Sequence, residues 1–319
     1  MGNIALVICS KEGRKPAIKG FISFVKYKIG SFIRNIKREK AENWLEQMQF
    51  EDILTFLINL PYDMGELKQF NKKRIERICR KISKVCVDRG INCCILPESL
   101  TGIFEINDIF ISAFGGRLLY KSILIDLINM ICRQKGVALS ELDVSVISGS
   151  DYGELIRIIK RLSGFVKYLT VVADSKESIE DEINDIFEET GLAVGITGDL
   201  KNALSNSRLI INLSKQNLKN NDYIKSKKII INYSGDCVKG SRQDSVINGV
   251  EVKLPELYSE RIKKEVYSFF SAVEIAEILI CQKVNCFNVK NGENVMSTGL
   301  YENINYEFLE GGYKLTGYR

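Results

Sequence analysis

Histidine is absent from this 319-residue chain, and proline is scarce, with 4 residues. Without histidine there is no Ser-His-Asp triad, no imidazole metal ligand and no imidazole proton shuttle. The apolar runs are short and interrupted by charge, and no leader with an apolar core opens the sequence, so we expect neither a membrane span nor secretion. The 45% hydrophobic and 27% charged residues are typical of a globular protein with room for two domains.

Cysteine is plentiful, but its spacing does not suit a metal site. The nine cysteines include no C-x-x-C pair, and no histidine is present to complete a ligand set. An odd number of cysteines fits a reducing compartment better than a disulfide framework. We therefore expect buried thiols, a cytoplasmic protein and no metal.

The formal charge of +5 is concentrated near the start of the chain. Residues 11–40 contain ten Lys and Arg but only two acids, Glu12 and Glu39, so this segment has a net charge of +8. The other residues together have a net charge of −3. Apolar residues recur every three or four positions here, which predicts a basic amphipathic helix over 18–40. It is either an ordinary helix with a solvated basic face or a docking element for an anionic membrane surface or an acidic protein. No nucleic-acid-binding motif accompanies it, so nucleic acid is not an expected partner.

Short apolar runs alternate with helical patterns along most of the chain, and this rhythm is typical of α/β domains with mainly parallel sheets. Strand-like runs occupy 3–9, 53–60, 91–96, 144–147, 168–172, 193–196, 208–213 and 228–233. We predict an α/β protein with two domains. An α/β substrate-type domain over 1–138 carries the basic helix. A doubly wound parallel-sheet domain over 139–319 ends in one long helix over 259–283.

One segment has the layout of a dinucleotide site. The predicted strand 144–147 runs into the loop Ser148-Gly-Ser-Asp-Tyr-Gly153, which opens a helix, and Asp174 ends the next strand 21 residues after Gly153. In such a site the loop backbone approaches the pyrophosphate, the helix N-terminus supplies N–H groups, and the acid accepts hydrogen bonds from the ribose. Asp174 has an alternative role as the N-cap of the helix that follows it.

Residues 143–214 resemble the nucleotide-binding domain of the shikimate dehydrogenase and glutamyl-tRNA reductase superfamily. The matching stretches are 146–155 (VISGSDYGEL), 169–174 (LTVVAD) and 198–212 (GDLKNALSNSRLIIN). The resemblance implies a Rossmann-like fold, an NAD or NADP cofactor, oxidoreductase chemistry and a substrate domain placed first. It also implies a set of cofactor-binding positions, namely Ser148, Gly149, Ser150, Gly153, Asp174 and Asn212.

The phosphate loop departs from the G-x-G-x-x-G pattern, whose glycine positions become Ser148, Ser150 and Gly153. Asp151 adds a negative charge where the pyrophosphate would lie, and it opposes an anionic ligand. Two hypotheses follow. The chain is a divergent oxidoreductase that binds NAD or NADP between its domains, or it is a non-catalytic binding or regulatory protein that has lost the cofactor and docks through residues 18–40.

Two further sets of residues are weaker candidates. Without histidine, a proton donor has to be another group, and Lys121 and Tyr233 are available. Gly115-Gly116-Arg117, together with Lys121, follows an apolar run and opens a helix, which predicts either an anion-binding turn or an ordinary turn with solvated cations. Neither the substrate nor the oligomeric state follows from the sequence, although a small-molecule ligand and a homo-oligomer are both compatible with it.

Overall fold

The protein is described by a computed structural model that covers residues 3–10, 41–50, 53–104, 110–111, 114–177, 179–215, 228–235, 245–286 and 299–319. The chain forms two compact units. The first unit comprises Met1–Leu118 and Lys253–Lys314, and the second comprises Leu119–Val252 and Leu315–Arg319. The chain therefore passes between the units three times, and neither unit is one continuous stretch of sequence.

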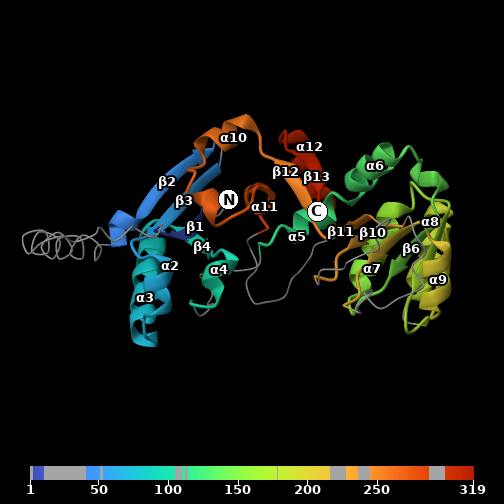
Figure 1. The fold of residues 1–319 in the computed structure, drawn as a ribbon, viewed down its shortest axis with the longest axis horizontal. Helices are drawn as coiled ribbons and strands as arrows, with labels where there is room; N and C mark the ends of the chain where they lie inside the picture. Colours follow the sequence, from blue (N-terminus) through green and yellow to red (C-terminus); the bar gives the residue numbers. More distant parts are fainter. Residues whose placement is uncertain are drawn as a thin grey trace, which may run out of the picture. The chain divides into compact units, whose positions relative to one another are not determined.

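The first unit is built on a five-stranded sheet with the order β2-β3-β1-β4-β5 (Figure 1). Its strands are β1 (Asn3–Cys9), β2 (Leu45–Phe50), β3 (Ile53–Leu60), β4 (Ile91–Ile95) and β5 (Phe110–Ile111). Strands β3, β1, β4 and β5 are parallel, and β2 is an antiparallel edge strand. Because parallel strands are covered on both faces, β1 is apolar and almost wholly buried along its length.

Helices cover both faces of this sheet. The helices of the first unit are α2 (Met64–Lys68), α3 (Lys72–Asp88), α4 (Glu98–Thr101), α10 (Glu256–Arg261), α11 (Ala272–Lys283) and α12 (Leu300–Glu310). Helix α5 (Arg117–Ser122) begins in the first unit and continues into the second. Ile75, Ile78 and Ile82 of α3 pack with Phe56 and Ile58 of β3. Side chains alternate along a strand, so Thr55 of β3 points to the opposite face, where it meets α11.

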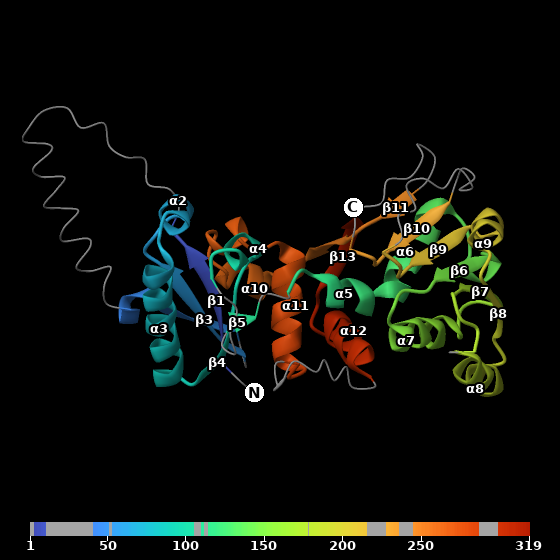
Figure 2. The ribbon, with the colours of Figure 1, turned by 90° about the horizontal axis from the view of Figure 1, so that it is seen from below.

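The second unit is a six-stranded, wholly parallel sheet with the order β8-β7-β6-β9-β10-β11. Its strands are β6 (Val144–Ile147), β7 (Tyr168–Val172), β8 (Ala193–Thr197), β9 (Leu209–Asn212), β10 (Ile229–Asn232) and β11 (Ser245–Ile247). The helices are α6 (Leu124–Lys135), α7 (Tyr152–Leu162), α8 (Glu180–Thr190) and α9 (Leu200–Asn206). Figure 2 shows α7 and α8 on one face of the sheet and α9 on the other. The predicted α/β class with a doubly wound parallel sheet is confirmed.

A two-stranded sheet joins distant parts of the chain. Strand β12 (Val250–Lys253) lies beside β13 (Lys314–Tyr318). Just before β12, the backbone of Gly249 exchanges two hydrogen bonds with Arg319, each 3.0 Å long. This pairing brings residues 315–319 back to the second unit, although about sixty residues of the first unit intervene in the sequence.

The division into units differs from the predicted boundary at residues 138/139. The structure places Leu119–Ala138, with α6, in the second unit, and it returns Lys253–Lys314 to the first. The predicted long helix over 259–283 is also wrong: the helix α10 ends at Arg261, a 3-10 turn follows at Val266–Ser268, and α11 begins at Ala272. The break has a local cause, because Ser271 and Glu274 form a capping box that starts a new helix.

The predicted basic helix over 18–40 lies outside the described residues, and so does Cys237. Every cysteine that the structure describes is a free thiol, and most are buried. Among these residues, no group of three His, Cys, Asp or Glu side chains is arranged to hold a metal ion. None of the described helices has both the length and the apolar character needed to cross a membrane.

A buried hydrogen bond ties α11 to the first sheet and provides a test of the unit assignment. The Thr55 hydroxyl donates to the Gln282 side-chain oxygen at 2.9 Å, and the Gln282 amide donates to the Leu54 carbonyl at 2.9 Å. Thr55→Val leaves the Gln282 oxygen buried without this donor, so we expect the free energy of unfolding in urea to fall by ~1–3 kcal/mol. A change below ~0.5 kcal/mol would contradict this packing of α11 on β3.

Candidate functional site

The loop after β6 approaches the end of β9 very closely. The backbone N–H of Ser148 donates to the Val172 carbonyl at 2.8 Å, which continues the pairing with β7 beyond the strand. A Cβ atom on Gly149 would lie 2.6 Å from the carbonyl oxygen of Leu213. Only glycine fits this contact, because the opposing atom belongs to the backbone. Gly149 therefore provides the close approach that the loop needs between neighbouring strand ends.

The helix α7 starts with a side-chain cap of its own. Asp151 is the N-cap residue, and its carboxylate accepts a hydrogen bond from the backbone N–H of Glu154 at 3.0 Å. A carboxylate at this position satisfies an N–H group and offsets the positive end of the helix dipole. In Rossmann-type sites these same groups face the pyrophosphate. Asp151 thus occupies, with its own charge, part of the environment that an anion would use.

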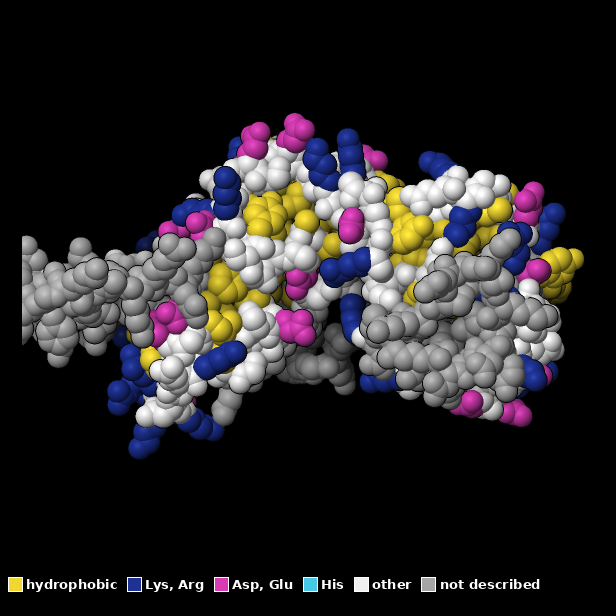
Figure 3. Space-filling view, viewed as in Figure 1, with side chains coloured by type: hydrophobic (Ala, Val, Ile, Leu, Met, Phe, Trp, Pro, Cys, Tyr) yellow, Lys and Arg dark blue, Asp and Glu magenta, His cyan; other side chains and the backbone are white. Residues whose placement is uncertain are grey.

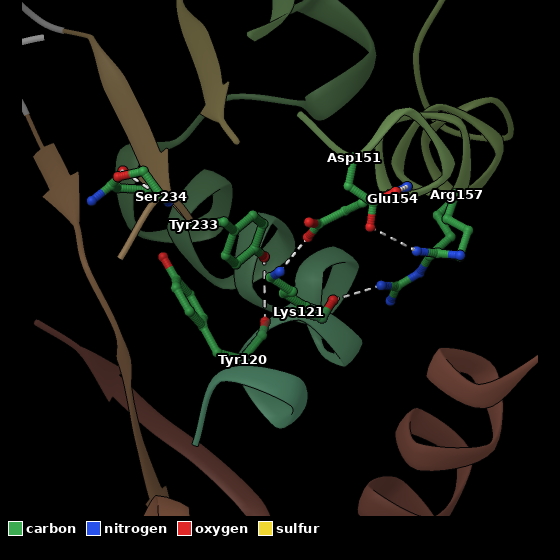
Figure 4. Close-up of polar contacts among 9 residues, drawn as sticks. Tyr120, Lys121, Asp151, Glu154, Arg157, Tyr233 and Ser234 are labelled. Carbon is green, nitrogen blue, oxygen red and sulfur yellow. Dashed lines mark hydrogen bonds and ion pairs between the residues drawn. The ribbon is translucent and has the colours of Figure 1, made fainter. Parts of the chain in front are cut away.

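A second carboxylate in the first turn of α7 is held by a lysine (Figure 4). Lys121, on α5, forms an ion pair with Glu154, and both side chains are less than one-fifth exposed. Arg161 of α7 fixes the same turn of α5, since it donates at 2.6 Å to the Lys121 carbonyl and also to the Ser122 carbonyl. The Lys121 backbone is therefore held in position beside the phosphate loop.

The charges around this turn are balanced. Arg157 lies 3.6 Å from the Asp151 carboxylate, which is itself 62% exposed. With Lys121 paired to Glu154, two cations meet two anions near the start of α7. An incoming pyrophosphate would find no net positive charge among these four side chains, so Coulomb attraction toward it is weak.

Asp174 stands apart from these pairs. It follows β7 directly, its side chain is exposed, and no described residue holds it in a hydrogen bond or ion pair. The prediction that it caps the next helix is wrong: α8 begins only at Glu180, its N-cap position is Ile179, and no side chain caps it. The carboxylate is therefore available at the carboxyl end of β7. Asp199, which follows β8, is by contrast used as the N-cap of α9.

Asn212 ends β9 inside a buried amide network. Its side-chain N–H donates to the Asn232 oxygen at 2.9 Å, and Asn232 donates in turn to the Asn248 oxygen at 2.7 Å. Ser214 also donates its backbone N–H to Asn212 at 3.2 Å. These bonds connect the carboxyl ends of β9 and β10 with the turn after β11. Asn212 is fully buried, so its role in the described structure is to hold this edge rather than to present a free amide.

Tyr233 and Tyr120 form a buried aromatic pair beside this network (Figure 4). Their ring centroids are 4.5 Å apart in an edge-on arrangement, and the Tyr233 hydroxyl donates to the Tyr120 carbonyl at 3.3 Å. The Tyr120 hydroxyl donates to the Ile247 carbonyl at 2.9 Å, and burial raises the pKa of Tyr120 well above its ordinary value. Both phenols point at backbone carbonyls, so neither is presented to a ligand.

The Gly115-Gly116-Arg117 turn belongs to the first unit, and its geometry is explained by packing. Gly116 has φ +73°, and a Cβ atom there would lie 2.5 Å from a methyl group of Val273. Both conditions require glycine. Gly115 and Arg117 are exposed, and α5, which begins at Arg117, has only six residues. The structure therefore supplies a reason for Gly116 that involves no anion.

Comparison with known proteins gives distant structural similarities only. No protein-family model matches the chain, and no curated protein sequence matches it. Shikimate 5-dehydrogenase from Listeria monocytogenes, solved with shikimate and NAD, is 11% identical over 87% of this chain and 96% of its own, with a TM-score of 0.34. Δ1-pyrroline-2-carboxylate reductase from Thermococcus litoralis is 9% identical over 39% of this chain and 37% of its own, with a TM-score of 0.28. Ornithine carbamoyltransferase from Pyrococcus furiosus is 11% identical over 91% and 86%, with a TM-score of 0.31.

The strand order of the second unit identifies its fold. Numbered within the second unit, the sheet runs 3-2-1-4-5-6 with every strand parallel. The second unit is a Rossmann domain. In such a domain, ligands bind outside the carboxyl ends of the strands, where the order reverses. Here that place lies between β6 and β9, at Ser148 and Gly149 on one side and Leu213 on the other.

Sequence reasoning missed the residues that organise the start of α7. Glu154, Arg157 and Arg161 were not candidates, although all three lie within the predicted helix. The spacing of Asp151 and Glu154 is a capping signal that could have revealed the N-cap. No comparable signal exists for the pairing of Lys121 with Glu154, because these residues lie 33 positions apart.

The two glycines of the loop provide a matched test. Gly149→Ala forces a Cβ atom against backbone, so we expect the free energy of unfolding to fall by ~1–3 kcal/mol. Gly153→Ala meets only the side chains of Asp151 and Arg157, which can move, and it lies in a helix, where alanine is favoured by ~1 kcal/mol. Urea unfolding should rank the Gly149 variant as clearly less stable. Equal stability of the two variants would contradict the close approach at Leu213.

Proposed function

We propose that the second unit binds NAD through its adenosine ribose, with Asp174 as the acceptor for the ribose hydroxyls. The observation that carries this proposal is the exposed, unshared carboxylate at the end of β7 in a sheet of Rossmann order. A carboxylate at this position recognises a ribose 2′-hydroxyl and repels a 2′-phosphate. The expected preference is therefore for NAD over NADP.

The phosphate loop would contribute less binding energy than usual. Asp151 and Glu154 place two carboxylates at the first turn of α7, and their partners Arg157 and Lys121 only balance them. Pyrophosphate binding would then depend on the backbone N–H groups of the loop around Gly149. We infer that the dinucleotide is held more through its ribose and adenine than through its phosphates.

As an oxidoreductase, the protein would need one proton donor beside the nicotinamide, which itself carries the hydride. Lys121 fits this role better than Tyr233. Lys121 lies beside the phosphate loop, and its ammonium group is paired with the Glu154 carboxylate. The Tyr233 hydroxyl is buried and already donates to a carbonyl.

A non-catalytic binding or regulatory protein is the second candidate. The observation that favours it is the capping of α7 by Asp151, which resembles the end of an ordinary structural helix more than an open phosphate site. On this alternative the domain keeps the Rossmann architecture as a scaffold, and partners bind elsewhere, with residues 18–40 as the docking segment predicted from the sequence.

Ligand titration followed by thermal unfolding separates the candidates. A ligand at 100 times its dissociation constant adds ~2.7 kcal/mol to the free energy of unfolding. We expect NAD and adenosine to stabilise the protein and NADP to stabilise it less. No shift with any of these compounds at millimolar concentration would remove the dinucleotide proposal and leave the non-catalytic candidate.

A pair of acid-to-amide variants assigns the site. Asp174→Asn should weaken NAD binding by ~1.5–3 kcal/mol, because it removes a charged hydrogen-bond acceptor. Asp181→Asn removes the same charge from the exposed first turn of α8 and should leave NAD binding unchanged. Isothermal titration calorimetry measures both. Equal affinities for NAD in the two variants would place the ribose away from Asp174.

A further inference from the structure

Helix α3 of the first unit concentrates positive charge on its outer face. Its 17 residues include seven Lys and Arg and only two acids, Glu76 and Asp88. The apolar positions Ile75, Ile78 and Ile82 are buried against the sheet, so the cations lie on the solvent side. Figure 3 shows dark-blue side chains gathered where α3 lies. Outside this helix and the basic segment 11–40, the chain is net acidic, so the charge of α3 is a local feature.

A hollow of about 420 Å³ opens on this face, and its volume lies in the range of small-ligand sites. The lining residues are Tyr62, Asn71, Lys73, Arg74, Arg77, Ile78 and Lys81. Four of these carry a positive charge, and among the described residues that line the hollow none is acidic. Lys73 and Arg77 are exposed on successive turns, and Lys81 follows one turn later. At 1.5 Å per residue, the cations from Lys73 to Lys81 extend over about 12 Å.

One of the cations, Arg74, contacts two aromatic rings. The guanidinium of Arg74 lies 3.6 Å from the centre of the Phe70 ring and 5.7 Å from that of Tyr62, and these two rings meet edge-on at 5.1 Å. Stacking uses the face of the guanidinium and leaves its N–H edge to donate. Asn71 caps α3 by accepting from the Arg74 backbone N–H at 3.0 Å, so this cation is anchored by both backbone and side chain.

We propose that this hollow binds a small organic bisphosphate, in which a short linker separates two phosphate groups. Arginine forks match phosphate oxygens, and a lining that contains four cations and no carboxylate suits a ligand with several negative charges. The 12 Å span of the cations suits two phosphates separated by a short linker. The proposal is independent of NAD binding, because all of its residues belong to the first unit.

The shape of the site favours a small ligand over a polymer. Single-stranded nucleic acids bind along grooves with exposed aromatic rings on which bases stack. Tyr62 is only 8% exposed, and Phe70, which has Arg74 over its ring, does not line the hollow. A membrane surface calls for apolar side chains beside the cations. The lining of the hollow offers instead Asn71 and charged groups around a buried Ile78.

The test uses two charge-matched double variants of the full chain. Lys73→Gln with Arg77→Gln removes two cations from the hollow. Arg80→Gln with Lys84→Gln removes one Arg and one Lys from the same helix but outside the hollow. Calorimetry with hexane-1,6-diol bisphosphate should show saturable binding to the unmodified protein, at least tenfold weaker binding to the first variant and less than threefold weaker binding to the second. Circular dichroism and thermal unfolding check that both variants are folded.

Several outcomes would overturn the proposal. Absence of binding at millimolar ligand removes it, and equal weakening in both double variants means diffuse electrostatic attraction without a site. Weakening of bisphosphate binding by Asp174→Asn would place the ligand in the second unit. A single-stranded oligonucleotide or phosphatidylglycerol vesicles that bind through α3 and are not displaced by the bisphosphate would assign the face to a polymer or a membrane.

Discussion

The backbone N–H groups in the first turn of α7 have no partners within the helix, and the way they are satisfied governs what the second unit can bind. In this protein the Asp151 carboxylate accepts a hydrogen bond from one of these groups, the backbone N–H of Glu154. The side chain of Glu154 forms an ion pair with Lys121. The helix end is thereby stable without a ligand. The same bonds reduce its attraction for phosphate, so recognition at this edge has to depend more on the neighbouring strand end, where Asp174 is exposed.

The two units differ in whether their surface cations are paired with acids. At the carboxyl edge of the second sheet, cations and anions are matched pair by pair. On α3 of the first unit, seven cations face two acids and leave a hollow without a carboxylate in its lining. The side chains at the start of α7 are therefore balanced in charge, whereas those of α3 are not, although phosphate binding is the usual expectation for a Rossmann domain.

The second sheet was predictable because wholly buried parallel strands are continuous apolar runs. The runs at 144–147 and 168–172 match β6 and β7 residue for residue. The return of α11 to the first unit was not predictable. It depends on the contact between Thr55 and Gln282, which lie 227 positions apart. Likewise, the need for glycine at position 149 follows from its close approach to the backbone of Leu213. Such a contact between two backbone segments cannot be recognised in the local sequence. Asp174 could be selected as a candidate because of its spacing from Gly153. That Asp174 does not cap the next helix became clear only from the structure, in which α8 begins at Glu180.

The three passages of the chain between the units have a consequence for synthesis on the ribosome. Strand β1 is made among the first ten residues, but the helix that packs on β3 beside it ends only at Lys283. The six parallel strands of the second unit, which is inserted between these parts, are complete at Ile247, whereas β12 gains its partner strand only when β13 has been made. Domains generally fold in the order in which they emerge. Here the face of the first sheet that receives α11 stays uncovered until residue 283 has been made, which is after all six strands of the second sheet.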